Sequence, residues 1–487
     1  MLYYALYQRS FNMSEIKVTP IAETNIDPNT LASHAARMCY TADTPQIGDM
    51  IDVKKRLFDT GHHSTLEHNY WTFMIENIPV SSVVFGLHLT APFYDTDQRS
   101  GRFSKMYDNP DMADIKNTLE TYYPQTSGRY ISKACDFIER GLNIYADKKD
   151  IVTQLARDAI KHERPKASDK YIESNAPKFA QEQLRMFVSM IAPTALDWTV
   201  DLATICAFYR TAWTPFMRDT MDKITTEIKT AHPDISYMFD EDARNTENWA
   251  PEFAKQKSNI GCEAFGLTPY ISAKYLGVKT RPEFQLLDYE YDNKKFKENK
   301  SRDTVDTLQF SPEYMNNSLM YVRSRIHIDA GATMGQDQRH RSIKRSKPVF
   351  TGYFYLPPLL AKAGLQEDAD MFMRTFYKMV RNPDISHSMV AAIAPYGAMV
   401  QYDKHADLNA LIHEQGKRTC WCAQEAIYHL ACDLRSELSG KIGEDAELMK
   451  YLTPPCLSMG HCVEGPRCCG RDIIADKING YFRDREI

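Results

Sequence analysis

The sequence predicts a mixed α+β protein with helices packed around small sheets. Residues 112–164 carry apolar side chains at helical spacing with charged outer faces. Residues 71–77 form a short apolar, aromatic stretch typical of a strand, and a periodic pattern returns at residues 321–329. The chain has 487 residues, more than one hydrophobic core usually supports, so we expect two or three domains.

The N-terminal region gives the clearest helix signals. Asp27 precedes Pro28 and a run of spaced apolar residues, which predicts a helix over 28–40. An acid at this position caps free N–H groups, and proline suits the first turn. A second helix is predicted over 49–59, ending before Gly61.

The middle of the chain predicts further helices. Residues 183–193 form an apolar run in which Arg185 is the one charged side chain. Such an arginine can contact a substrate or extend its guanidinium to the surface. Residues 197–210 and a helix that follows to about residue 228 complete a first unit.

Charge and hydropathy exclude several classes of protein. The net charge is −5, which gives no general attraction to nucleic acid or to an anionic membrane. No apolar run reaches the roughly 20 residues that a membrane helix needs. The first residues are too few and too polar for a signal peptide, so a cytoplasmic location is expected. The start could be Met1 or Met13.

A basic motif late in the chain is the strongest candidate for a binding site. Gln336 is followed by Arg339, His340 and Arg341, on an expected helix with no acid close after them. Arginine binds phosphate or carboxylate through paired hydrogen bonds. The alternative is a solvated basic helix face.

A second candidate lies in the first unit. His62, His63, Glu67 and His68 invite a zinc interpretation, but His63 and His68 are five residues apart and diverge on a helix. A buried hydrogen-bonded cluster is the other alternative. Further on, the Ser-Gly-Arg sequence at 100–102 could wrap a phosphate, since glycine permits close backbone approach, or form an ordinary surface turn.

The two halves of the chain share a sequence pattern. Residues 185–193 align with 387–395, ending in Ile-Ala-Pro in both, and the Asp-Leu pair at 201–202 aligns with that at 407–408. Copies about 200 residues apart indicate an internal duplication. We expect a first unit over 14–235, a connector and degenerate front end over 236–310, a second unit over 311–445 and a cysteine-rich tail over 446–487.

These motifs together resemble the flavin-dependent thymidylate synthase (ThyX) family. The family signature has an H-x-S/T-x-x-E-H stretch, a strand, Q-x-x-R-H-R, a loop N-E-x-S-x-R-Y, and later R-x-x-x-x-A-Q-W-E. Here the first and third pieces lie in the first unit, and the second and fourth lie in the second unit. Asp97 and Gln98 stand where the family has N-E, and the first unit lacks both arginines of R-H-R.

The resemblance implies a composite site to which each unit contributes part. The implied dUMP-binding residues are Gln98, Ser100, Gly101, Arg102, Arg185, Gln336, Arg339 and Arg418, with Arg418 and Ser100 as catalytic residues. The implied FAD-binding residues are His62, Ser64, Gln98, Arg339, His340 and Arg341. The family is a homotetramer with sites between chains, so a fused pair is expected to form a homodimer that imitates it.

The implied reaction is conversion of dUMP to dTMP with methylenetetrahydrofolate, FAD and NADPH. Small molecules, and neither nucleic acid nor membrane, are the expected partners. One alternative is a flavoenzyme that makes another one-carbon modification of a pyrimidine nucleotide, since Gln98 replaces an acid. Another is a non-catalytic nucleotide-binding or scaffold protein.

Cysteines crowd the last seventy residues. Cys456, Cys462, Cys468 and Cys469 do not follow the paired C-x2-C spacing of common zinc fingers. The hypotheses are buried free thiols, a structural zinc or iron–sulfur site on these four residues, and redox pairing.

Overall fold

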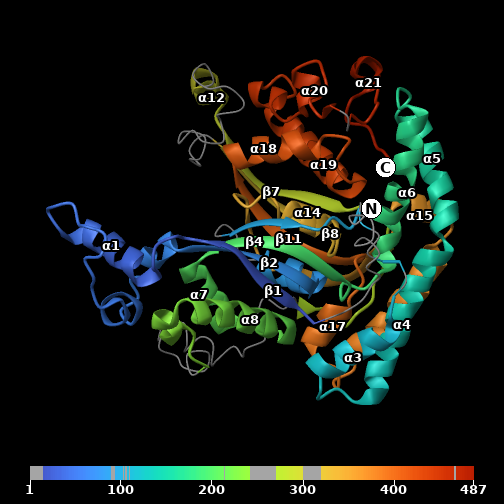
Figure 1. Cartoon of the computed structure of the whole chain (residues 1–487). Coiled ribbons are helices and arrows are strands. Elements are labelled where there is room, and N and C mark those ends of the chain that lie inside the picture. The colour runs from blue at the N-terminus through green and yellow to red at the C-terminus, as the bar shows by residue number, and fades with distance from the viewer. Residues whose placement is uncertain are drawn as a thin grey trace.

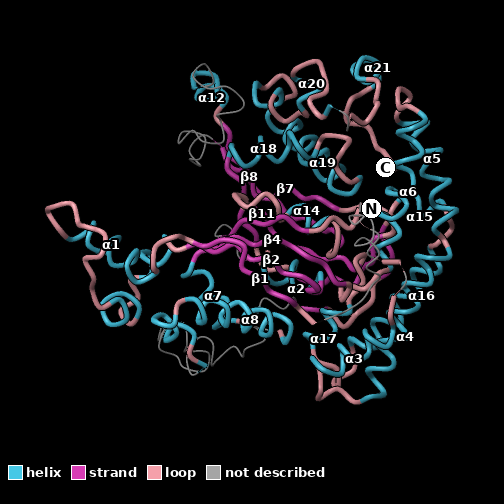
Figure 2. The backbone as a smooth tube through the Cα atoms, viewed as in Figure 1, coloured by secondary structure: helices cyan, strands magenta, loops and turns pink. Residues whose placement is uncertain are grey.

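The structure is a computed structural model and describes residues 15–88, 94–102, 104, 107–108, 110–212, 214–241, 270–299, 320–465 and 468–487. It confirms the mixed α+β class: two sheets lie at the centre and helices surround them (Figures 1 and 2). Much of the expected connector, residues 242–269 and 300–319, lies outside the described residues.

The first sheet is formed by the N-terminal half and is antiparallel throughout. Its strands lie in the order β1 (Lys17–Glu23), β2 (Tyr70–Pro79), β4 (Pro193–Asp201) and β3 (Tyr94–Gln98). Strand β2 contains the predicted strand at 71–77 and alternates exposed with buried side chains, as a half-buried strand does.

Helices of the first half flank this sheet. Helix α1 (Pro28–Tyr40) is capped by Asp27, as predicted, because its carboxylate accepts the Thr30 N–H at 2.9 Å. Helices α7 (Leu202–Thr211) and α8 (Pro215–Ala231) pack against the sheet, followed by the short η5 (Pro233–Phe239). A layer on the other side contains α3 (Met112–Tyr122), α4 (Gly128–Asp147), α5 (Lys149–Glu163) and α6 (Asp169–Leu184).

The second sheet comes from the C-terminal half. Its main path is β5 (Tyr270–Ile271), β10 (Val349–Tyr355), β11 (Ala398–Asp407), β8 (Met320–Asp329) and β7 (Glu283–Tyr291). Strand β6 (Gly277–Lys279) pairs with β10, and β9 (Lys344–Arg345) pairs with β11. Strand β8 contains the periodic stretch at 321–329.

Helices α18 (Leu408–Arg418) and α19 (Glu425–Ile442) cover this second sheet. The remaining helical segments of this half are α12 (Asn293–Asn299), α14 (Thr333–Asp337), α15 (Pro358–Lys362), α16 (Gln366–Val380), α17 (His387–Ile393), η7 (Glu447–Lys450), α20 (Pro455–Ser458) and α21 (Ile473–Asn479). None of the helices in the described part of the chain is long and apolar enough to cross a bilayer.

The two halves join where their matching sequences meet. Met190 N–H donates to Ala394 O at 2.8 Å, and Tyr396 N–H donates to Val188 O at 2.8 Å. This antiparallel contact lies within one large hydrophobic cluster that includes buried residues of both sheets, such as Phe73 and Phe354. The halves therefore share one core.

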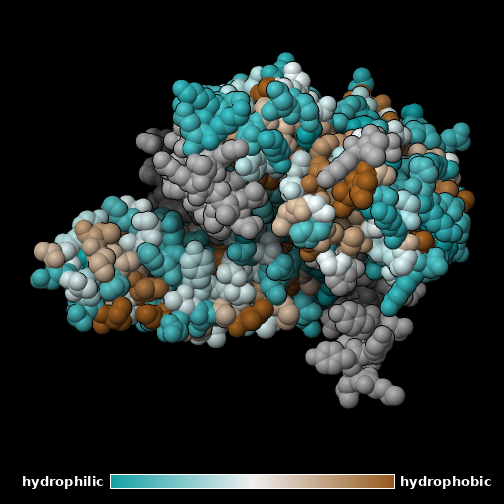
Figure 3. Space-filling model, turned by 90° about the horizontal axis from the view of Figure 1, so that it is seen from above, coloured by the Kyte–Doolittle hydropathy of each residue, from teal (hydrophilic) through white to brown (hydrophobic). Residues whose placement is uncertain are grey.

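The N-terminal arm, defined here as residues 24–69, projects away from the sheets at the left of Figure 1. It carries α1, η1 (Lys54–Phe58) and η2 (His63–His68). Large apolar side chains are exposed on it, among them Tyr40 at 77% and Ile47 at 57%, and the projecting part shows apolar patches in Figure 3. Such a surface is typical of a protein–protein contact.

Two helix predictions in the first half are wrong in their extent. The helix predicted over 49–59 is reduced to η1, because the Asp52 carboxylate accepts the Lys55 N–H at 3.0 Å and starts the helix there. The helix predicted over 183–193 ends at Leu184, followed by the single turn η4 (Arg185–Phe187). The backbone beyond it pairs with residues 394–397 instead.

The helix predicted to carry the Arg-His-Arg motif is also shorter. Helix α14 ends at Asp337, and residues 339–341 form turns. The buried Asp337 carboxylate pairs with Arg345 at 2.6 Å and with Lys404 at 2.5 Å. These ion pairs hold the segment in place and turn the chain toward β9.

Candidate functional site

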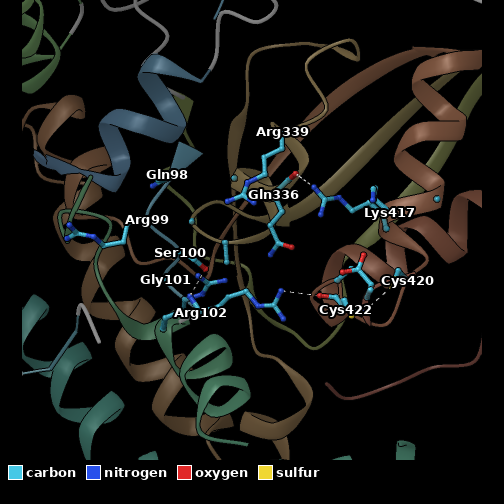
Figure 4. A pocket seen from close by; sticks show the side chains of 18 of the residues that line it. Gln98, Arg99, Ser100, Gly101, Arg102, Gln336, Arg339, Lys417, Cys420 and Cys422 are labelled. Atoms are coloured by element: carbon cyan, nitrogen blue, oxygen red, sulfur yellow. Dashed lines mark hydrogen bonds between the residues drawn. The ribbon is translucent and has the colours of Figure 1, made fainter. Parts of the chain in front are cut away.

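A cavity of about 390 Å³ lies between the two halves of the chain. Eight residues singled out from the sequence line it: Gln98, Ser100, Gly101, Arg102, Arg185, Gln336, Arg339 and Arg418. Figure 4 shows several of these side chains converging from segments far apart in the sequence. The structure thus brings together the dUMP-binding residues that the resemblance implies.

The loop after β3 forms one wall of the cavity. Gln98 ends the strand, and the buried Gln181 side chain donates to the carbonyls of Gly101 and Ser104, both at 2.7 Å. Arg102 pairs with the buried Glu182 and donates to Cys422 O at 3.1 Å, a bond drawn in Figure 4. The loop is therefore fixed by helix α6 and by the second half.

Gln424 connects two lining residues of the cavity, one from each half of the chain. Its Oε1 accepts from Arg185 Nη2 at 3.0 Å and from Gln336 Nε2 at 2.6 Å. Arg185 is buried and also donates to Glu182 O at 3.1 Å. It therefore points inward rather than extending to the surface.

A buried ionic network supports the opposite wall. Asp337 accepts from Arg345, from Lys404 and from the Tyr402 hydroxyl at 2.8 Å. Lys404 also pairs with buried Glu414 at 2.5 Å. The Arg345 and Lys404 charges hold the pKa of Asp337 well below its usual range despite burial. This network fixes the end of α14, and Arg418 donates to the carbonyl of Gln336 in the same helix.

The cavity has a strong excess of positive charge. Its basic side chains are Arg99, Arg102, Arg185, Arg339, Lys417 and Arg418, and Glu464 is the one acid among its described lining residues. Burial lowers the pKa of Arg418 to about 10, and burial with the nearby charge of Arg102 lowers that of Arg339. Clustered, partly desolvated cations of this kind favour a bound anion.

Four residues implied to bind FAD do not line this cavity. His62 and Ser64 are exposed on the N-terminal arm. His340 is buried against the His413 ring, with centroids 5.3 Å apart, and burial holds its pKa well below its usual range. Arg341 pairs with Asp95 and lies over the Tyr94 ring.

The cysteine-rich tail does not form the predicted metal site. No three of the described His, Cys, Asp or Glu residues come together as a metal-binding group. Cys456 and Cys462 line the cavity, whereas Cys468 and Cys469 do not. The tail is held by packing instead: the Arg471 guanidinium lies 3.7 Å from the Trp421 ring centroid and 3.8 Å from that of Tyr481.

Several lining residues were not predicted as site residues. Lys417 precedes Arg418, and Cys422 lies within the A-Q-containing motif that begins at Arg418, so the motif itself was the available signal. Tyr396 also lines the cavity, and no sequence signal identified it. It follows directly after the Ile-Ala-Pro match of the second half.

Comparison with known proteins finds a similarity to one family in somewhat less than half of the chain, at its N-terminal side. Residues 21–252 match the family described as thymidylate synthase complementing protein. No curated protein matches the sequence significantly.

Two solved structures are similar to parts of the chain. A UMP/dUMP methylase, PolB from Streptomyces cacaoi bound with 5-Br UMP, is 11% identical, with a TM-score of 0.29, covering 37% of this chain and 99% of that one. Thymidylate synthase X from Helicobacter pylori with FAD and dUMP is 15% identical, also with a TM-score of 0.29, covering 48% of this chain and 100% of that one.

Proposed function

We propose that this chain is a flavin-dependent enzyme that methylates dUMP. The proposal starts from the match of residues 21–252 to the thymidylate synthase complementing protein family. The reaction we assign to it forms dTMP with methylenetetrahydrofolate as the carbon donor and NADPH as the reductant. One observation supports this most directly: the arginine-lined cavity contains the eight residues implied to bind dUMP.

The arginines have two roles in this proposal. Arg102 and Arg339 bind the nucleotide phosphate, since both line the cavity and come from different halves. Arg418 contacts the pyrimidine ring and stabilises negative charge that develops there. The hydrogen bond from Arg418 to the Gln336 carbonyl, together with partial burial, restricts the orientation of the Arg418 side chain before the substrate binds.

The residues present fit part of a flavin site. Gln98 and Arg339 line the cavity and would hold the flavin beside the nucleotide. The flavin, when bound, supplies the redox chemistry of the reaction. A cavity of about 390 Å³ is near the lower end of the usual size for ligand sites, roughly 300–1,000 Å³. It suits one nucleotide better than a nucleotide together with an entire dinucleotide.

A second copy of the chain would complete the flavin site. His62 and Ser64 lie on the N-terminal arm, which is apolar and exposed. In a homodimer, each arm would pack against the partner and bring these two residues to the partner's cavity. This arrangement gives two composite sites.

The test measures flavin and nucleotide binding and product formation. Purified protein is expected to bind FAD and to convert dUMP to dTMP. Arg339→Ala should weaken dUMP binding by roughly 10- to 100-fold, since a hydrogen bond to a charged group contributes about 1.5–3 kcal/mol. Arg374→Ala is the matched control, because Arg374 is an exposed arginine of α16 that pairs with Asp370.

Absence of both FAD binding and dUMP binding in the wild-type protein would exclude the proposal. A modified pyrimidine nucleotide other than dTMP would instead identify a related one-carbon reaction. Binding of dUMP without any turnover would favour a nucleotide-binding protein that has lost its catalysis.

A further inference from the structure

Two cysteines lie on one tight turn in the wall of the cavity. Cys420 and Cys422 both line it, just after Arg418 at the end of α18. Ala423 N–H donates to Cys420 O at 2.9 Å, which closes a β-turn, and Cys422 N–H donates to Cys420 Sγ at 3.5 Å. Figure 4 shows the two side chains next to each other.

Arginines from three separate segments hold this turn. Arg164 and Arg485 donate to Trp421 O at 3.1 and 2.7 Å. Arg102 donates to Cys422 O, and Arg485 also donates to Ala423 O. Three consecutive carbonyls thus accept from guanidinium groups, so the turn is rigid and its surroundings are electropositive.

These surroundings favour a reactive thiol at Cys420. The hydrogen bond from Cys422 lowers the pKa of Cys420 to about 6, and the charge of Arg485 acts in the same direction, whereas burial and Glu464 oppose them. The same interaction raises the pKa of Cys422. Low-pKa cysteines that are partly exposed beside positive charge are the ones that oxidants attack. No disulfide links any of the ten cysteines in the described residues.

We propose that Cys420 and Cys422 form a redox-active dithiol site in the cavity wall, with a hydroperoxide as its oxidant. The Cys420 thiolate attacks the peroxide, forming an S–O bond as the O–O bond breaks, and hydroxide or an alkoxide leaves. The Cys422 thiol then attacks the resulting sulfenic acid, forming the S–S bond as the S–O bond breaks and water leaves. The dithiol loses two electrons and two protons, and the peroxide is reduced.

The geometry selects Cys422 as the resolving residue. A disulfide needs Cα atoms within roughly 7 Å, which two residues of one β-turn satisfy. Cys456 and Cys462 line the same cavity but come from the tail. The Cys456 Sγ lies 2.9 Å from the Tyr481 hydroxyl, and burial raises its pKa.

The experiment treats the reduced full-length protein with hydrogen peroxide and maps the products by mass spectrometry. The peptide that follows Arg418 contains Cys420, Cys422 and also Cys432, so Cys432→Ser is the matched control that removes the ambiguous thiol. We expect this peptide to lose two hydrogens in the wild type and in Cys432→Ser. Cys422→Ser should stop at a sulfenic acid on Cys420, trapped by dimedone.

Cys420→Ser should react at least tenfold more slowly at neutral pH, since an ordinary thiol is only a few per cent thiolate there. Equal rates for Cys420→Ser and the wild type, or a disulfide that joins Cys420 to Cys456, would overturn the proposal. Thermal melting of each serine variant separates altered reactivity from misfolding. The thiol measurement needs neither nucleotide nor flavin, so its failure is distinguishable from failure of the proposed function.

Discussion

Glu425 is a fully buried carboxyl beside the site, at the start of α19. Burial, together with nearby Glu182, raises its pKa from 4.5 to about 8, although the Tyr355 hydroxyl donates to it at 3.0 Å. The folded state keeps this proton up to about pH 8, whereas the unfolded chain releases it near pH 4.5. Folding stability from this group therefore falls as the pH rises between these values, by up to about 1.4 kcal/mol per pH unit.

Glu425→Gln should remove this loss of folding stability at higher pH. The glutamine amide has nearly the same shape as the carboxyl group and still accepts from the Tyr355 hydroxyl, but it has no titrating proton. We expect the free energy of unfolding of the variant to exceed that of the wild type by an amount that grows from pH 5 to pH 8. Urea titrations across this range measure it. Parallel pH profiles for the two proteins would contradict the assignment.

Glu444→Gln is the control for this measurement. A hydrogen bond from Arg435 lowers the pKa of Glu444, so its contribution has the opposite sign. Stability from Glu444 is present above the unfolded pKa and is lost as the pH falls through the lower folded value. The free energy of unfolding of Glu444→Gln should therefore not exceed that of the wild type at pH 8.

At the same scale, sequence motifs predicted the cavity residues well but not their partners. Arg102, Arg339 and Arg418 could be assigned because arginines in a matching motif have a direct chemical use. Glu182, which pairs with Arg102, and Gln424, which accepts from Arg185 and Gln336, could not be identified from the sequence. Their role depends on burial and on contacts between residues at least 80 positions apart, which no local pattern contains.

Helix α4 approaches the turn that carries Arg185 very closely. A Cβ atom on Gly141 would lie 2.1 Å from the Phe187 carbonyl oxygen, and a backbone atom cannot move aside cheaply. Gly141→Ala should therefore lower the free energy of unfolding by about 1–3 kcal/mol, the usual cost of overpacking. Denaturant unfolding monitored by circular dichroism measures the change.

Gly440→Ala provides the matched comparison. Gly440 is exposed in α19, and nothing lies within 4 Å of its added Cβ. Alanine there should stabilise the helix by roughly 0.5–1 kcal/mol. Equal changes in the free energy of unfolding for the two substitutions would show that the close packing of α4 against Phe187 does not require glycine at position 141.

Local signals also explain which elements were predicted correctly. The cap at Asp27 predicted the start of α1, and the apolar, aromatic stretch at 71–77 predicted β2, because both signals act within a few residues. The ends of α6 and α14 were missed because distant groups determine them. Residues 394–397 compete for the backbone after α6, and Lys404 and Arg345 bind the last residue of α14.

At the scale of the molecule, the proposed homodimer predicts complementation between inactive chains. Ser64→Ala would damage the arm, and Arg339→Ala would damage the cavity. If each site combines the arm of one chain with the cavity of its partner, half of the dimers in an equal mixture are mixed. Each of these has one intact site, which gives about a quarter of wild-type activity after co-expression.

The control mixes Arg339→Ala with Arg102→Ala. Both changes affect the cavity of their own chain, so no combination restores an intact site and no activity should return. Recovery in this control, or none in the Ser64→Ala mixture despite dimers in sedimentation measurements, would mean that arm and cavity do not combine across chains.

Arg485 donates hydrogen bonds to the carbonyls of Trp421 and Ala423, and this affects when the cavity can form during synthesis of the chain. The ribosome makes the chain from its N-terminus, so the loop at residues 98–102 emerges long before the arginine that fixes the facing wall. Domains generally fold in the order in which they are synthesised. The nascent protein can form its first sheet early, but it gains a finished ligand pocket only after translation has passed Arg485.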